Sequence, residues 1–141
     1  MMPLSRGRAL VLACLLVVLT WRGARTQQAA ATAPDSITPA MVALGDSVFH
    51  GAKGGGTCAV CHGADAKGTS GLAPGLIKAK WLHGDGSYAF IVGLVQQGVP
   101  QPKEAPTPMP PMGGANLSPE QVRGVAAYVY GLNHPAKKRS P

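Results

Sequence analysis

The stretch Cys58-Ala59-Val60-Cys61-His62 decides how the rest of this 141-residue chain is interpreted. Two cysteines separated by two residues and followed at once by histidine form the C-x-x-C-H pattern by which c-type haem is attached to protein. Each thiol can add across one vinyl group of the porphyrin, and the next residue then offers an imidazole nitrogen to the iron. The pattern predicts one covalent haem c on Cys58 and Cys61, with His62 as an axial iron ligand.

Other chemistries of a C-x-x-C pair fit this sequence less well. A thioredoxin-like pair needs a βαβ setting, whereas this pair lies in residues 51–75, where eight glycines predict loop. A zinc site needs further ligands, and the chain has no second C-x-x-C. A structural disulfide remains open, because exported proteins form them. The third cysteine, Cys14, lies in the N-terminal leader, so the pair would be the only cysteines of a processed chain.

The N-terminal residues have the composition of an export segment. Arg6 and Arg8 precede an apolar run over residues 9–20, which is shorter than the ~20 residues of a membrane-spanning helix. We expect residues 1–31 to be an export signal or an uncleaved anchor, and residues 32–37 to be a tether. Residues 134–141 are expected to form a basic tail. This predicts a periplasmic or otherwise extracytoplasmic protein that meets the membrane only through its N-terminal segment.

The net charge of +7 does not indicate a nucleic-acid-binding protein. Four of the 13 Lys and Arg lie in the leader, so cleavage near residue 31 leaves nine against six Asp and Glu, a net charge of +3. A modest positive excess steers association with an oppositely charged surface. We therefore expect no nucleic acid partner, and instead a redox protein donor and acceptor with an acidic docking face.

Capping signals and apolar spacing predict helices and no strand. Each predicted helix begins at a hydroxyl residue that can cap its first turn, and the three cover approximately residues 38–50, 87–97 and 118–132. Small or aromatic faces, formed by Gly45 in the first helix and by Gly124, Tyr128 and Gly131 in the last, would let these two helices approach closely where they cross. The predicted class is all-α, with long loops that need a rigid cofactor to pack on.

The ordered set of features resembles the class I, mitochondrial-type c-type cytochromes, here of a bacterial single-haem kind. Besides the attachment sequence, the matching pieces are Gly45 and Phe49 of the first helix, Ala73-Pro74-Gly75-Leu76, Met109-Pro110-Pro111-Met112-Gly113-Gly114 and Val125-Ala126-Ala127-Tyr128-Val129. The resemblance covers roughly residues 38–132. It implies the cytochrome c fold over residues 38–133, with crossed N- and C-terminal helices around one covalent haem.

The same resemblance implies roles for Pro74 and Trp81. The proline carbonyl of the loop accepts a hydrogen bond from the haem-binding histidine, and a metal-bound histidine needs such an acceptor to fix its tautomer. The alternative is that Pro74 is only a turn residue with no role at the haem site. An indole N–H is a donor only, so Trp81 is expected either to donate to the haem propionates or to pack on the haem as a partly buried aromatic.

The second axial ligand has more than one candidate. Met109 precedes Pro110 in a stretch with six prolines between residues 100 and 111, and this stiff strap could press its thioether on the iron. The family pattern also favours a methionine just before proline, so we predict Met109 over Met112. Alternatives are two methionines that only fill the core, or a second histidine ligand from His50, His83 or His134, each expected to be exposed.

The predicted ligands suggest a function without substrate chemistry. A His/Met iron has no open position and a raised reduction potential, which favours electron transfer between Fe(II) and Fe(III). The first hypothesis is an extracytoplasmic electron carrier that is not an enzyme. The alternatives are an electron-transfer subunit of a larger oxidoreductase or terminal oxidase, and a haem-based ligand sensor or peroxidase-like protein.

Overall fold

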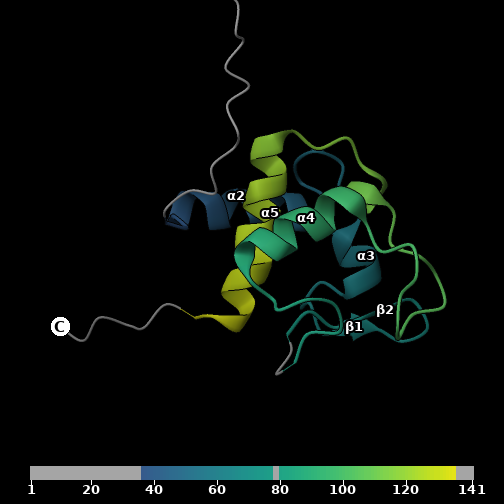
Figure 1. Ribbon diagram of the computed structural model, residues 1–141. Coiled ribbons are helices and arrows are strands. Elements are labelled where there is room, and N and C mark those ends of the chain that lie inside the picture. The colour runs from purple at the N-terminus through teal and green to yellow at the C-terminus, as the bar shows by residue number, and fades with distance from the viewer. Residues whose placement is uncertain (1–35, 78–79, 136–141) are drawn as a thin grey trace, which may run out of the picture. The chain divides into compact units, whose positions relative to one another are not determined.

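The computed structural model describes residues 36–77 and 80–135, and the structural statements below concern these residues. The expected export segment, most of the tether and residues 136–141 of the tail lie outside them. The elements in chain order are α2 (Pro39–Phe49), α3 (Cys58–His62), β1 (Gly68–Thr69), β2 (Ala73–Pro74), α4 (Tyr88–Gln97), the 3-10 helix η2 (Pro111–Gly114) and α5 (Pro119–Asn133) (Figure 1).

Side-chain caps begin the three longer helices, as the sequence predicts. The Thr38 and Ser87 hydroxyls each accept a hydrogen bond from the backbone N–H three residues further on, at 3.2 Å. At α5, Ser118 Oγ accepts from the Gln121 N–H at 3.2 Å, and Gln121 Oε1 accepts from the Ser118 N–H at 2.8 Å. This reciprocal capping box satisfies N–H groups that the first helical turn leaves without partners.

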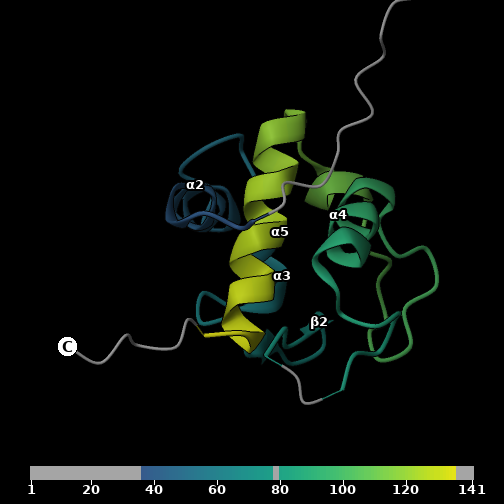
Figure 2. The same ribbon diagram turned by 60° about the vertical axis from the view of Figure 1, so that its left-hand side comes forward.

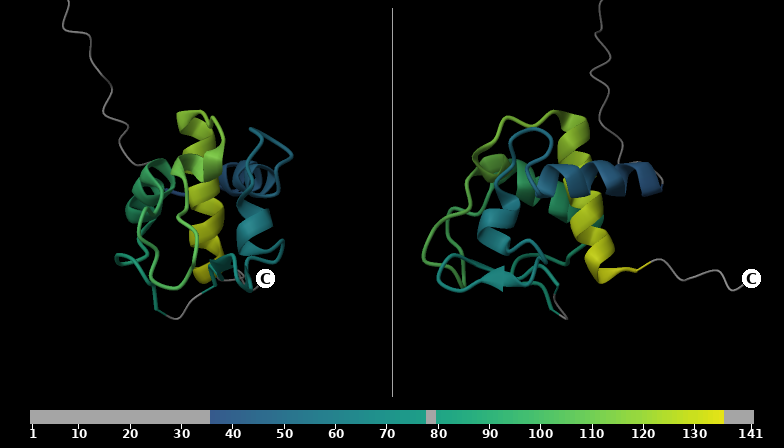
Figure 3. Two further views of the ribbon diagram at one scale, coloured as in Figure 1. Left: turned by 90° about the vertical axis from the view of Figure 1, so that its right-hand side faces the viewer. Right: turned by 180° about the vertical axis from the view of Figure 1, so that it is seen from behind.

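Helix α5 is flanked by α2 and α4 (Figures 2 and 3). The contact with α2 runs through glycines: a Cβ on Gly45 would overlap the Gly124 carbonyl and lie 2.8 Å from Tyr128 Cβ. The three helices share one apolar core, whose main members are Val48, Phe49, Ile91, Val95, Val122, Val125, Ala126 and Val129. Each of the three helices therefore contributes one apolar face to the core.

The expectation of no strand is wrong for one short hairpin. β1 and β2 pair antiparallel, with Gly68 opposite Pro74 and Thr69 opposite Ala73. Strands of two residues are too short to show the alternating pattern by which a strand is recognised in sequence. The hairpin follows the attachment helix and fixes the backbone at Pro74.

His50 joins the end of α2 to the segment that follows the attachment helix. Its Nδ1 lies 3.0 Å from the Asp46 carbonyl oxygen and 3.1 Å from Asp46 Oδ1, and its Nε2 lies 2.9 Å from the Ala64 carbonyl oxygen. A neutral imidazole carries one N–H, whereas an imidazolium donates from both nitrogens. Hydrogen bonds to the Ala64 and Asp46 carbonyls, in that order, therefore raise the pKa of His50.

The raised pKa predicts a pH-dependent contribution to stability. We expect His50→Ala to lower the free energy of unfolding in acid more than in base, because stabilisation by the charged form is complete below the unfolded pKa of about 6.5 and disappears as pH rises through the higher folded pKa. His50 is exposed, so the loss should stay below ~1 kcal/mol. Urea unfolding at about pH 5.5 and about pH 8.5 tests this, and an equal loss at both values would contradict it.

Candidate haem-binding site

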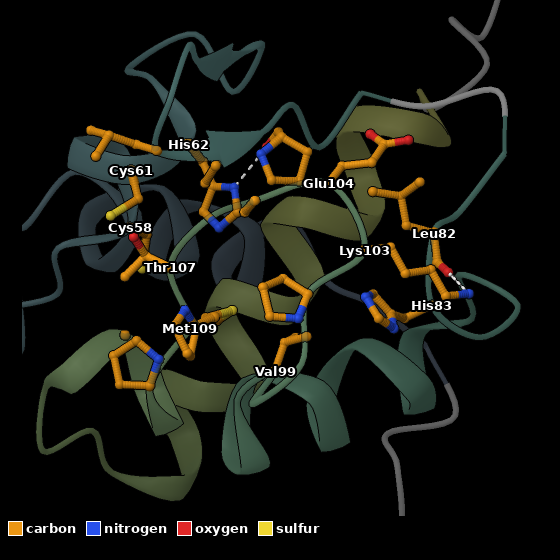
Figure 4. A pocket seen from close by; sticks show the side chains of 18 of the residues that line it. Cys58, Cys61, His62, Leu82, His83, Val99, Lys103, Glu104, Thr107 and Met109 are labelled. Carbon is orange, nitrogen blue, oxygen red and sulfur yellow. Dashed lines mark hydrogen bonds between the residues drawn. The ribbon is translucent and has the colours of Figure 1, made fainter.

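One pocket brings together five of the six residues predicted to bind the cofactor. Cys58, Cys61, His62, Pro74 and Met109 all line it (Figure 4). The cysteines and the histidine come from α3, the proline from β2, and the methionine from the segment between α4 and η2. The rest of the lining is mostly apolar and includes prolines of the predicted strap.

The short helix α3 places the attachment residues on consecutive turns. Cys58 is half-buried and Cys61 is exposed, and both thiols are free, so the structure does not join them in the disulfide that the sequence left open. Burial raises the pKa of the Cys58 thiol above its usual range, because a low-dielectric surrounding disfavours the thiolate. Two free thiols at the pocket edge are what thioether attachment requires.

The His62 ring is oriented by the backbone of Pro74. His62 Nδ1 lies 2.9 Å from the Pro74 carbonyl oxygen, and because a carbonyl can only accept, Nδ1 carries the proton and donates it. Nε2 is then left with its lone pair for a metal. The hairpin that holds Pro74 needs glycine at Gly68, where φ is +96° and a Cβ would lie 2.5 Å from the Gly75 nitrogen.

The two candidate methionines have different surroundings. Met109 lines the pocket, and its backbone forms an isolated antiparallel bridge with Val99. Met112 packs partly buried against the core and does not line this pocket. Figure 4 shows His62 and Met109 facing the same space from two sides. The structure thus brings the predicted methionine, and not its alternative, to the pocket of His62.

Trp81 and His83 both lie near the main pocket, but only His83 lines it. Trp81 packs against the core and lines a smaller neighbouring pocket rather than the one that contains Met109. His83 was expected to be exposed, and that is wrong, because it is half-buried and lines the main pocket. Lys103 Nζ donates to the Leu82 carbonyl oxygen at 2.6 Å. This contact between distant segments holds residues 82–83 at the pocket, and no sequence pattern signals it.

The donor set fits haem c. It offers two free thiols, an imidazole with an available Nε2, and a thioether, around a mostly apolar space. Within residues 36–77 and 80–135, no group of three or more His, Cys, Asp or Glu could hold a bare metal ion. The porphyrin of haem c would supply the remaining ligands of an iron held here, and with it one-electron Fe(II)/Fe(III) chemistry.

This helical domain and its pocket define a c-type cytochrome domain. The family described as cytochrome C oxidase, cbb3-type, subunit III, matches residues 40–129. The chain belongs to this family, and its cofactor is therefore covalently bound haem c. The resemblance noted from the sequence holds at the level of a cytochrome c domain.

Similar proteins carry the same oxidase description. A cbb3-type cytochrome c oxidase subunit CcoP of Rubrivivax gelatinosus is 38% identical over 77% of this chain and 30% of its own length. The subunit FixP of Rhizobium meliloti (strain 1021) is 36% identical over 67% of this chain and 28% of its own. CcoP of Rhodobacter capsulatus is 39% identical over 53% and 25%. The chain thus spans under a third of these relatives, and no solved structure matches it.

The comparisons correct one expectation and agree with others. The prediction that the protein is not an enzyme is wrong for the family, because the relatives are described as subunits of a cytochrome c oxidase, an oxidoreductase complex. It was drawn from the lack of catalytic groups in this chain, which says nothing of chemistry on other subunits. Haem-based electron transfer outside the cytoplasm agrees with the family. Among the described residues, none of the helices could cross a membrane.

Proposed function

We propose that residues 38–133 form a domain that transfers single electrons through one haem c, attached at Cys58 and Cys61 with His62 and Met109 as axial ligands. The observation that carries this is the His62–Pro74 hydrogen bond of 2.9 Å on one side of a pocket whose other side presents Met109. The contact between α2 and α5 at Gly45 and Gly124 supports the crossed terminal helices of the cytochrome c fold.

Each protein group has a part in this function. The Pro74 carbonyl holds the His62 ring in one tautomer, and the mostly apolar lining suits contact with a porphyrin. With His62 and Met109 both as ligands, no coordination position is open to oxygen, and the thioether raises the reduction potential. Trp81 lines a pocket that shares Leu82 and His83 with the main one, which supports its indole as a propionate donor.

A more specific role follows from the family. We infer that the domain passes electrons to a terminal oxidase of the cbb3 type, because the relatives are described as subunits of that enzyme. Residues 1–31 would export or anchor the chain, residues 32–37 would tether the domain, and residues 134–141 would form a basic tail. Membrane association would then come from the N-terminal segment.

The partner's docking face is proposed to be acidic. The described residues carry five Lys and Arg and five Asp and Glu. The net charge of +3 after residue 31 therefore comes from Lys78 and the tail residues 137–139, offset by Asp35. A charge of this kind accelerates association with an acidic surface and loses its effect at high salt.

Spectra of the matured protein test the electron-transfer proposal. We expect low-spin spectra in both oxidation states, reversible one-electron reduction, and no change when carbon monoxide is added to the reduced protein. Immediate binding of carbon monoxide would instead favour the ligand sensor. For the oxidase role, membranes of a producing host that lacks this chain should lose oxygen consumption supported by a cbb3-type oxidase. A His62→Ala chain should then fail to restore it.

A further inference from the structure

The end of α4 and the methionine segment are joined by backbone hydrogen bonds. The Val99 N–H donates to the Met109 carbonyl oxygen at 2.8 Å, and the Met109 N–H donates to the Val99 carbonyl oxygen at 3.0 Å. Both bonds of this pair belong to the backbone of the residue proposed as the axial ligand. The position of Met109 is therefore set from α4, ten residues earlier in the chain.

Gly98, the residue that precedes this bridge, leaves no room for a side chain. It ends α4 with φ +71°, and its N–H donates to the Leu94 carbonyl oxygen at 2.8 Å. A Cβ there would overlap the Met109 carbonyl oxygen and lie 2.8 Å from the Pro111 nitrogen. The left-handed backbone and the close approach both require glycine, and the atoms that a side chain would displace belong to the methionine segment.

The far end of the methionine segment is tied to the attachment helix. Thr57 directly precedes Cys58, and its Oγ1 donates to the Gly113 carbonyl oxygen at 2.7 Å. Between the two ties, Met112 and Gly113 have φ of +54° and +66°, and a left-handed conformation is unfavourable for methionine. Residues 109–113 are thus held at one end by α4 and at the other by the residue next to the haem thiols.

We propose that Gly98 and Thr57 are positioning residues that keep the Met109 thioether on the iron, an inference that rests on the proposed His62/Met109 ligation. A thioether is a neutral ligand at the end of a flexible side chain, so its ligation depends on how firmly its backbone is placed. Gly98 allows the bridge to form, and Thr57 stops the segment from moving away from α3. Loss of either the Val99–Met109 bridge or the Thr57–Gly113 hydrogen bond would free one coordination position of the iron. The haem would stay attached to its cysteines.

Gly98→Ala and a matched glycine variant test this inference. Gly71 has φ +75° and nothing within 4 Å of a built Cβ, so Gly71→Ala brings similar backbone strain without the overlap. We expect Gly98→Ala to lose the sulfur-to-iron charge-transfer absorption of the oxidised protein. We also expect its carbon monoxide-reactive fraction to rise at least ~10-fold. Gly71→Ala should keep both properties of the wild type. Pyridine haemochrome spectra show whether the haem stays covalently bound.

The outcomes separate this inference from the proposed function. A wild type that lacks the charge-transfer absorption would reject His62/Met109 ligation itself. If the wild type shows this absorption, but the Gly98→Ala protein keeps its haem and does not bind carbon monoxide, only the positioning role of Gly98 and Thr57 is overturned.

Should Gly98→Ala fail to fold, Thr57→Val removes one hydrogen bond at constant volume. It should raise carbon monoxide reactivity by a smaller factor, and Thr57→Ser should restore the wild-type value. A Thr57→Val protein with the carbon monoxide reactivity of the wild type would then overturn the proposed positioning role.

Discussion

Replacing Gly45 by valine is expected to unfold the domain or to lower its free energy of unfolding by at least ~3 kcal/mol. A Cβ at this position would overlap the Gly124 carbonyl and lie 2.8 Å from Tyr128 Cβ. Two of the groups it meets are backbone atoms of α5, which cannot turn aside as a flexible side chain can. Separation of α2 from α5 would open the core at Val48 and Phe49, both almost completely buried.

A second glycine supplies the control for this prediction. Gly131 also lies in α5, but nothing lies within 4 Å of a Cβ built on it. Gly131→Ala should therefore leave stability unchanged or raise it by up to ~1 kcal/mol, as replacement of an unneeded helical glycine does. Urea unfolding followed by far-ultraviolet circular dichroism measures both variants. A Gly45→Val protein as stable as Gly131→Ala would show that the helices do not need this close contact.

The parts of the fold that the sequence predicts are those with local causes. Each of the three longer helices is capped through a hydrogen bond to a residue three positions away, from Thr38, Ser87 or Ser118. The start of each helix can therefore be predicted from neighbouring residues. The attachment pattern is local in the same sense, since Cys58, Cys61 and His62 lie within one short helix. The β1–β2 hairpin escaped prediction because four paired residues carry no periodic signal.

The parts of the site that the sequence does not predict depend on contacts between distant segments. His83 reaches the pocket through a segment whose Leu82 carbonyl is bound by Lys103. Gly98 matters because Met109, eleven residues further along the chain, returns to pack against it. Glycine in these loops signals a turn, but not which neighbour requires it. The sequence offers the oxidase role only as an alternative to a free carrier, because the same haem-binding residues serve both and neither motif nor spacing names the electron acceptor.

Met109→Ala is expected to open the iron to external ligands. Met109 lines the pocket that contains His62, and its backbone is fixed by the bridge to Val99. Removal of the thioether should abolish the sulfur-to-iron absorption, let the reduced protein bind carbon monoxide, and lower the reduction potential, because methionine ligation raises it. Absorption spectra with and without carbon monoxide, together with a redox titration, measure all three. The covalent haem content should not change, because Cys58 and Cys61 are untouched.

Met112→Ala is the matched control, since it removes the same side chain three residues further on. Met112 packs partly buried against the core and does not line the pocket, so its loss should cost stability, roughly 1–3 kcal/mol for a partly buried methionine, and leave the spectra as in wild type. The reverse pattern, with normal spectra in Met109→Ala and carbon monoxide binding in Met112→Ala, would move the axial ligand to Met112. Unchanged spectra in both variants, with no sulfur-to-iron absorption in the wild type, would leave a histidine as the ligand. His83 would then be the first to replace, because it lines the same pocket while His50 and His134 do not.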